Sequence, residues 1–397
     1  MSLADPQLRV LYVGTLAPQG AGATLCCSEL LAGLSSIGHG VRALRPATQE
    51  EANQPDLVAR ANPSIQVERY TVPFLEQDPY HPASEEFREI QRERIIEALQ
   101  EMIDREPADV LLIGRESFVW HLPEFARNCS VPCVVMAHGV VLAILEGIFP
   151  PKLGQELLAQ CRRANLVVAC AEHMACGLQN LGFENTRVIP NGIDSTRFVP
   201  GTRNGRLADK LDIGIGDTVV LHASHLHDWK RPLDLVYSAR KALQHNQTLL
   251  YLIVGDGPEK QSMESACHRL NVRDRFRFAG WIEYSAMPDY MLLADIVVMP
   301  SDFEGMARVY LEAQACGRAL LASDIPAASE VVEDGLTGML FRRGDVNELA
   351  KKTAILASDP IQRQTLGENA RKQIEERHTL SQIAAEYSQT LSCVACS

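Results

Sequence analysis

Residues 304–312 read EGMARVYLE and place the carboxylates of Glu304 and Glu312 eight residues apart, with a glycine after the first. Eight residues correspond to a little over two helical turns, so a helix through this segment would carry both carboxylates on one face. The preceding run at 295–301, DIVVMPS, is rich in β-branched residues and ends in Pro and Ser. Together the two runs predict a strand, a glycine-containing turn and a helix.

This succession of elements suits a phosphate group, because a helix N-terminus presents unpaired backbone N–H groups and the positive end of the helix dipole. A carboxylate at Glu304 beside that anion is unfavourable unless it accepts hydrogen bonds, and sugar hydroxyls are suitable donors. The pattern therefore fits a ligand in which a sugar is joined to a phosphate. It fits equally well a Glu304 that caps the helix dipole and a Glu312 on a solvated face, and the spacing alone does not decide.

The segment resembles the Glu-x7-Glu motif of the retaining GT-B glycosyltransferases of the group 1 / family 4 type, which include sucrose, glycogen and mannosyl transferases. In that family the first Glu contacts the donor hexose, the amides after it hold sugar and pyrophosphate, and the second Glu binds the ribose hydroxyls. The resemblance assigns these roles to Glu304, to Gly305, Met306 and Ala307, and to Glu312. It implies two Rossmann-like, doubly wound α/β domains facing a central cleft.

Composition limits the class of protein. The chain has 397 residues, 46% hydrophobic and 22% charged, which is an ordinary globular composition and enough for two domains. A formal net charge of −12 argues against nucleic acid as a partner. Eleven cysteines, an odd number in a chain too large to need disulfide bonds, favour a reducing, cytoplasmic compartment. No membrane span or secretory signal is visible, while peripheral contact at the inner face of the membrane stays open.

Strand-like and helical segments alternate along the chain, as in doubly wound sheets. The periodicity is lost over 199–217, which is rich in glycine, and then restarts. We therefore expect one domain at 1–198 and a second at 199–378. The resemblance implies that the first binds the acceptor and the second the donor, and that a C-terminal helix at 379–397 packs back on the first domain. The predicted strands are 8–14, 38–44, 110–113, 134–136, 166–169 and 187–189, followed by 219–222, 249–254, 275–278, 296–299, 319–322 and 339–341.

Two segments of the first domain are candidate site residues. Gly20, Ala21 and Gly22 follow the first strand, where glycine lets the backbone approach a ligand. A simple tight connection explains this loop as well as an anion cradle does. His138 ends the strand at 134–136, at the sheet edge where ligands gather. In the resembling family a His at this place touches the sugar near the scissile bond, and the resemblance gives His138 that role.

Cations are expected on the donor side. The family carries an Arg five residues before a Lys after the first strand of the second domain, both neutralising the donor pyrophosphate. Lys230 matches the Lys, whereas His225 stands in place of the Arg. Because neutral histidine lacks both the permanent charge and the forked geometry of arginine, neutralisation falls more on Lys230 and on a second cation such as Arg231 or Arg308. Gly255, in a turn after the next strand, is expected near the nucleotide.

These features predict a retaining transferase that moves a hexose from a nucleoside diphosphate sugar to a hydroxyl acceptor. The chain contains no Asp-x-Asp pair of the kind that holds a metal on the pyrophosphate in GT-A enzymes, so we expect no metal and no further cofactor. His138, Lys230 and Glu304 are the predicted catalytic residues. Two alternatives stay open, a GT-B sugar-nucleotide epimerase and a non-catalytic nucleotide-sugar-binding subunit.

Overall fold

Several strands of the structure are short apolar runs that are buried along their whole length. Strands β5 (Cys133–Ala137) and β9 (Leu249–Val254) have every residue buried. Runs of this kind favour parallel sheets, because helices then cover both faces of the sheet. The structure is a computed structural model that describes residues 7–16, 22–48, 57–72 and 85–396.

Two parallel sheets form, one in each of two units that we call unit 1 (residues 1–192 with 380–397) and unit 2 (residues 193–379). The division falls at Gly192–Ile193, inside the PNGID segment at 190–194, whereas the sequence prediction set the boundary between 198 and 199. The seven-stranded sheet of unit 1 has the order β3-β2-β1-β4-β5-β6-β7, and the six-stranded sheet of unit 2 has the order β10-β9-β8-β11-β12-β13. Both sheets are doubly wound, which confirms the predicted fold class.

Unit 1 contains one strand that the sequence did not reveal, β3. Its sequence, QVERYT, has only two apolar residues, Val67 and Tyr70, and it lies at the edge of the sheet with only Tyr70 buried. The strands of unit 1 are β1 Arg9–Val13, β2 Gly40–Ala47, β3 Gln66–Thr71, β4 Val110–Ile113, β5 Cys133–Ala137, β6 Leu166–Ala169 and β7 Thr186–Val188. Its helices are α1 Gly22–Ser36, α2 Leu57–Ala61, α3 Glu85–Arg105, α4 Leu122–Asn128, α5 Val140–Leu145, α6 Pro151–Cys161, α7 Glu172–Asn180 and α16 Leu380–Ala395, with a 3₁₀ turn at Glu116–Phe118.

In unit 2 every described strand was expected from the sequence, to within a few residues at the ends. The strands are β8 Thr218–Ala223, β9 Leu249–Val254, β10 Phe276–Gly280, β11 Ile296–Met299, β12 Ala319–Asp324 and β13 Met339–Arg342. The helices are α8 Gly205–Lys210, α9 Pro232–His245, α10 Lys260–Arg269, α11 Met287–Leu293, α12 Arg308–Ala315, α13 Pro326–Ser329, α14 Val346–Ser358 and α15 Pro360–Arg377. Three 3₁₀ turns lie at Asp228–Lys230, Arg273–Arg275 and Tyr284–Ala286.

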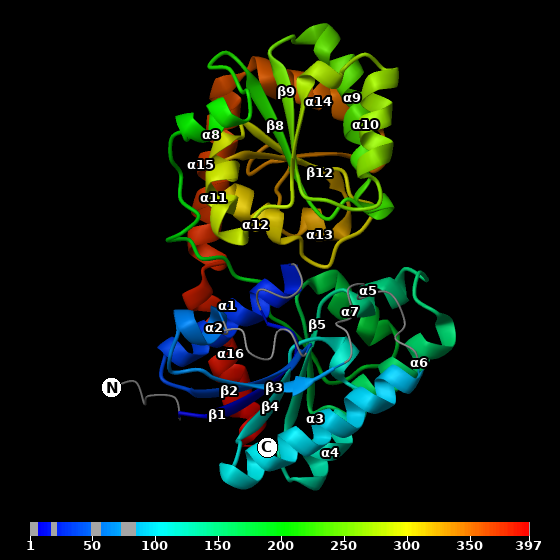
Figure 1. Cartoon of the computed structure of the whole chain (residues 1–397), viewed down its shortest axis with the longest axis vertical. Helices are drawn as coiled ribbons and strands as arrows, with labels where there is room; N and C mark the ends of the chain where they lie inside the picture. Colours follow the sequence, from blue (N-terminus) through cyan, green and yellow to red (C-terminus); the bar gives the residue numbers. More distant parts are fainter. Residues whose placement is uncertain (1–6, 17–21, 49–56, 73–84, 397) are drawn as a thin grey trace. The chain divides into compact units, whose positions relative to one another are not determined.

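Successive residues of the unit 2 strands enter two different hydrophobic clusters, because side chains alternate between the faces of a sheet. Val297 and Met299 of β11 belong to one cluster, and Ile296 and Val298 belong to the other. Figure 1 shows the helices that cover each face: α8, α11, α12 and α15 on one side, and α9, α10 and α14 on the other. The sheet is thus enclosed on both faces, and its accessible parts are the loops at the strand ends.

The C-terminal helix α16 belongs to unit 1, where it packs on α1 (Figure 1). A Cβ at Gly33 of α1 would lie 2.8 Å from the Cβ of Ala384, so the glycine permits this close approach of the helices. The ring of His39 links α16 to the residue before β1, because Nδ1 accepts from the amide of Leu8 at 3.0 Å and Nε2 donates to the hydroxyl of Ser388 at 2.8 Å.

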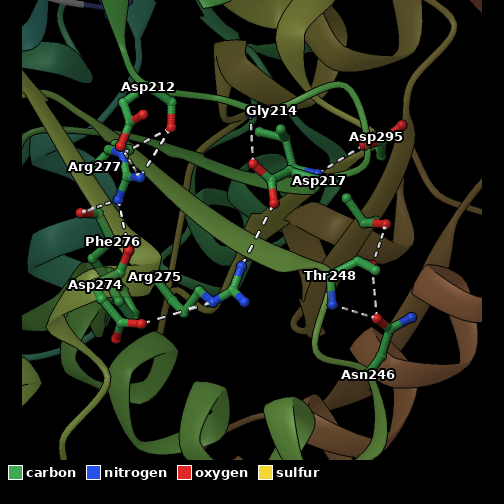
Figure 2. A network of polar contacts seen from close by, with 12 residues as sticks. Asp212, Gly214, Asp217, Asn246, Thr248, Asp274, Arg275, Phe276, Arg277 and Asp295 are labelled. Atoms are coloured by element: carbon green, nitrogen blue, oxygen red, sulfur yellow. Dashed lines mark hydrogen bonds and ion pairs between the residues drawn. The ribbon is translucent and has the colours of Figure 1, made fainter.

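A polar network holds the N-terminal ends of the unit 2 strands (Figure 2). Asp217, just before β8, accepts from the amide of Gly214 at 2.7 Å and pairs with Arg275 at 3.6 Å. Asp295, just before β11, accepts from the amide of Val219 at 2.7 Å. These contacts fix the ends of the strands that face away from the loops carrying the predicted donor residues. The opposite, C-terminal ends are the place where ligands bind in sheets of this type.

Candidate functional site

The strand order of unit 2 reverses between β8 and β11, and a reversal of this kind is the expected ligand site in doubly wound sheets. The loop after β8 carries Lys230, and the loop after β11 carries Glu304. Nζ of Lys230 donates to Oε1 of Glu304 at 2.5 Å, and the hydroxyl of Ser301 donates to the same oxygen at 2.7 Å. The fold thus brings together two of the predicted catalytic residues, 74 positions apart in the chain.

Glu304 does not lie on a helix, which corrects the expected shared helical face with Glu312. Helix α12 begins at Arg308, and Ala307, at the N-cap position, has an extended backbone with φ −68° and ψ 116°. The segment from Gly305 to Ala307 therefore precedes the helix. The two carboxylates are brought to the same sheet edge by a loop and a helix. The N–H groups of the first turn of α12 have no acceptors within the helix and point toward this loop.

Glu312 is held in a buried ion pair. Nε of Arg308, one helical turn earlier, donates to Oε1 of Glu312 at 3.0 Å, and each side chain is only 5% exposed. Nε of Arg308 also lies 3.0 Å from the hydroxyl oxygen of Tyr284, which accepts from it. The guanidinium of Arg308 stands 5.0 Å from the centre of the Tyr284 ring. Arg308, whose charge was predicted to neutralise the donor phosphate, is thus paired with Glu312.

Aromatic rings line the loop that follows β8. His225 is exposed and meets His227 edge-on at 4.2 Å between ring centres, and His227 stacks on Trp229 at 4.0 Å. Trp229 in turn faces Phe303, next to Glu304, at 6.1 Å. This series of rings connects the loops after β8 and β11 beside Lys230.

His222 is fully buried near the end of β8. Its Nδ1 donates to the carbonyl of Val298 at 2.9 Å, and its Nε2 accepts from the hydroxyl of Ser224 at 2.7 Å. Burial, with a smaller effect of the Lys230 charge, lowers the pKa of His222 to about 4, so the ring is neutral. Sequence reasoning gave this residue no role, although an apolar strand ending in a histidine was visible.

Position 255 requires a glycine, because the backbone of Ser224 approaches it closely. Its φ is +121°, and a Cβ would lie 1.9 Å from the carbonyl oxygen of Ser224. Its amide donates to the carbonyl of Gly280 at 2.8 Å, so the loops after β8, β9 and β10 meet at this residue. The structure shows a packing reason for Gly255, and the predicted proximity to the nucleotide stays a prediction.

In unit 1, His138 directly follows β5. Glu116, after β4, accepts from the amide of His138 at 2.6 Å and from that of Val141 at 3.2 Å. Nε2 of His138 lies 3.9 Å from Sγ of Cys27. Burial, together with the charge of Arg115, lowers the pKa of His138 to about 3, so its imidazole is neutral.

The remaining predicted residues give a mixed outcome. Gly20 and Ala21 lie outside the described residues, and Gly22 is the first residue of helix α1, whereas the sequence placed it in the loop.

Among residues 7–16, 22–48, 57–72 and 85–396, no three His, Cys, Asp or Glu side chains gather as a metal site would require. A search of the same ranges finds no helix long and apolar enough to cross a membrane.

Two protein-family models match this chain. Residues 206–373 match the model of the glycosyl transferases group 1, and residues 21–197 match that of glycosyltransferase family 4. The chain belongs to these glycosyltransferases. Together the two models account for both units, and the first spans Lys230, Glu304 and Glu312.

Two relatives and one solved structure show how far this glycosyltransferase resembles known members. A GDP-mannose-dependent monoacylated alpha-(1-6)-phosphatidylinositol monomannoside mannosyltransferase of Corynebacterium glutamicum is 33% identical over 198 residues, 47% of this chain and 51% of the relative. The N-acetyl-alpha-D-glucosaminyl L-malate synthase of Bacillus anthracis is 24% identical over 73% of this chain and 76% of its own. Anabaena HepE, solved with UDP and glucose, superposes with a TM-score of 0.78 over 98% of this chain and 100% of its own, at 21% identity. The match thus spans about half of the mannosyltransferase, and the likeness to HepE concerns the fold.

Proposed function

We propose that this glycosyltransferase moves a hexose from a nucleoside diphosphate sugar to a hydroxyl acceptor with retention of configuration. The observation that carries the proposal is the contact of Lys230 with Glu304 at the reversal of strand order in unit 2. An ammonium group and a carboxylate there suit the two halves of such a donor, because one attracts phosphate and the other accepts hydrogen bonds from sugar hydroxyls. The names of the relatives, GDP-mannose-dependent in one case, and the UDP bound to HepE support a nucleotide-sugar donor.

Donor binding would exchange the partners of this pair. The ammonium of Lys230 now donates to Glu304, whose side chain is 10% exposed. A bound pyrophosphate would take the ammonium and the N–H groups of Gly305, Met306 and Ala307, while hexose hydroxyls donate to Glu304 in its place. An ionised carboxylate has about four lone-pair sites, so Glu304 can keep the hydrogen bond from Ser301 during this exchange.

Glu312 would then receive the ribose hydroxyls. Arg308 donates to one of its oxygens, which orients the carboxylate in the middle of α12. His138 of unit 1 is neutral, and its remaining hydrogen-bonding capacity suits a sugar hydroxyl better than a phosphate.

The reaction would proceed by attack from the same face of the sugar. In this mechanism the departing phosphate oxygen accepts the acceptor's proton, so the protein needs no covalent sugar intermediate. The contribution of Lys230 and of the amides of residues 305–307 is to stabilise the charge that develops on the leaving pyrophosphate. We propose that they do so without a divalent ion. The cytoplasm, which holds nucleotide sugars, is the proposed compartment.

The test begins with a calorimetric screen of one nucleotide sugar at a time, followed by time-dependent release of nucleoside diphosphate with the donor that binds. Lys230→Ala should weaken donor binding by roughly 10-fold or more, since a charge-assisted contact contributes about 1.5–3 kcal/mol. Lys372→Ala, which removes a lysine that is 77% exposed on α15, should leave binding unchanged. Donor binding without turnover would indicate a non-catalytic subunit, and an isomerised nucleotide sugar would indicate an epimerase.

A further inference from the structure

Unit 1 has its own reversal of strand order, between β1 and β4, and an arginine follows β4 there. Val13 and Ile113 are paired at the ends of these strands, and Arg115 comes two residues later, at the N-cap of the 3₁₀ turn Glu116–Phe118. The chain is fixed just before it, because the amide of Gly114 donates to the carbonyl of Val13 at 2.9 Å. Arg115 therefore stands on a rigid edge where this kind of sheet binds ligands.

The guanidinium of Arg115 has no hydrogen bond or ion pair with the described part of the chain. The residue is half-buried, and its Nε atom is buried without an acceptor. The adjacent Glu116 does not pair with it, because Oε1 of Glu116 accepts from the amides of His138 and Val141. An unmatched buried donor is unfavourable for folding, and such departures from satisfied pairing concentrate at functional sites.

The charge of Arg115 acts on four neighbouring groups, those of Tyr12, Cys27, Glu116 and His138. Burial raises the pKa of the Cys27 thiol to about 12 and raises that of Tyr12, while His138 has its pKa lowered to about 3, so these three groups are neutral near pH 7. Burial also raises the pKa of the Glu116 carboxyl, and the hydrogen bonds from backbone amides and the charge of Arg115 oppose that shift. Oε1 of Glu116 is turned to backbone amides, and its Oε2 is buried without a hydrogen-bond partner among the described residues.

Other arginines of the same unit behave differently. Arg9 pairs with Asp109 at 2.6 Å, and Arg105 pairs with Glu68 at the same distance. The buried guanidinium of Arg42 donates to the carbonyl oxygens of the α3 end and pairs with Glu106. Within the described part of this acidic chain, the half-buried guanidinium of Arg115 is thus unlike these arginines in having no hydrogen bond or ion pair.

We infer that Arg115 binds an anionic group of the acceptor, a phosphate or a carboxylate, so that the enzyme prefers acceptors that carry one near the reacting hydroxyl. The inference rests on the proposed transferase function and specifies its acceptor class. Arginine suits the task because its planar fork can donate two parallel hydrogen bonds to either anion. The donor pyrophosphate is the other source of such an anion, and the experiment separates the two.

The first arm titrates inorganic phosphate into the full chain by calorimetry, in a Lys230→Ala background that disables the proposed donor-phosphate site. We expect phosphate to bind this protein, and Arg115→Gln added to it should weaken binding about 10-fold or more. Arg60→Gln, which replaces an exposed arginine of α2, is the matched control and should leave phosphate binding unchanged. Equal phosphate binding in all three proteins would overturn the inference.

The second arm compares acceptor pairs that differ by one anionic group, glycerol with glycerol 3-phosphate and myo-inositol with its monophosphate. Wild type should release nucleoside diphosphate about 10- to 100-fold more efficiently with the phosphorylated member, and Arg115→Gln should reduce that ratio with donor Kd changed less than about twofold. A matching loss of donor affinity in Arg115→Gln would assign the anion to the donor and reject the acceptor role. Phosphate binding that depends on Arg115, without turnover on any acceptor, would instead contradict the transferase function and leave the anion site intact.

Discussion

The buried pair of Arg308 and Glu312 gives the sharpest prediction of stability. Both side chains are 5% exposed, and Nε of Arg308 lies 3.0 Å from a Glu312 oxygen. Removing one member of such a pair leaves an unpaired buried charge, at a cost of about 3–5 kcal/mol. Arg308→Met also leaves the Tyr284 hydroxyl without this donor, which adds roughly 1 kcal/mol. Arg308→Met should therefore destabilise unit 2 somewhat more than Glu312→Met.

Replacing both members should cost much less than the two single changes added together. Two methionines fill a similar volume and bury no charge, so the double variant is expected to lie within about 2 kcal/mol of wild type. The difference between the double variant and the sum of the single ones is the coupling energy of the pair. If Glu312 binds the donor ribose, the double variant should still lose donor affinity by about 10-fold or more, which separates stability from function.

Native-state hydrogen exchange of the amides in β11 and β12 measures this effect in the full chain, because these central strands report global opening of unit 2. The control is the pair of Arg371 and Glu375 on α15, which has the same i,i+4 spacing and a glutamate that is 54% exposed. Glu375→Met should change the opening free energy by less than about 1 kcal/mol. Single changes at 308 and 312 that cost no more than this control, or that add up in the double variant, would refute the reasoning.

Three further predictions concern backbone, pH and metal. Gly255→Ala should destabilise unit 2 by more than about 2 kcal/mol in urea unfolding, because its Cβ would meet a carbonyl oxygen at 1.9 Å, whereas Gly205→Ala, with open space around it, should not. His138 has a pKa of about 3 in the folded protein against about 6.5 for an ordinary histidine, so the unfolded chain binds more protons between these values and stability falls as pH drops below 6.5. His222, with its pKa lowered to about 4, adds a similar loss, so between pH 7 and pH 5 His138→Gln should lose roughly 2 kcal/mol less than wild type in urea unfolding, and an identical loss in the variant would exclude a contribution of His138. Nucleoside diphosphate release should survive EDTA, and full loss with recovery on adding Mn²⁺ or Mg²⁺ would show a metal requirement.

The sequence predicted the strands of unit 2 because most of them are short apolar runs bounded by turn residues. The same rule failed at β3, since QVERYT has only two apolar residues and lies at the edge of the sheet. The sequence also led us to place Glu304 on a helix, although it lies in a loop. Residues 304–312 contain good helix formers, yet Gly305 and the extended backbone of Ala307 delay the helix to Arg308. A spacing of eight residues was therefore read as two turns when half of it is loop.

The sequence did not reveal which partners the arginine side chains of the two sites have. Arg308 was expected to neutralise phosphate, and nothing in its local sequence shows that Tyr284, 24 positions earlier, and the burial of α12 direct it to Glu312. Arg115 is the converse case, an arginine beside a glutamate that looks paired in sequence and is not paired in the fold. The carboxylate of Glu116 accepts from backbone amides, whereas that of Glu312 accepts from a guanidinium one helical turn away. The unmatched guanidinium that results is where a ligand's charge has most to contribute, because its Nε is already out of water before the ligand arrives.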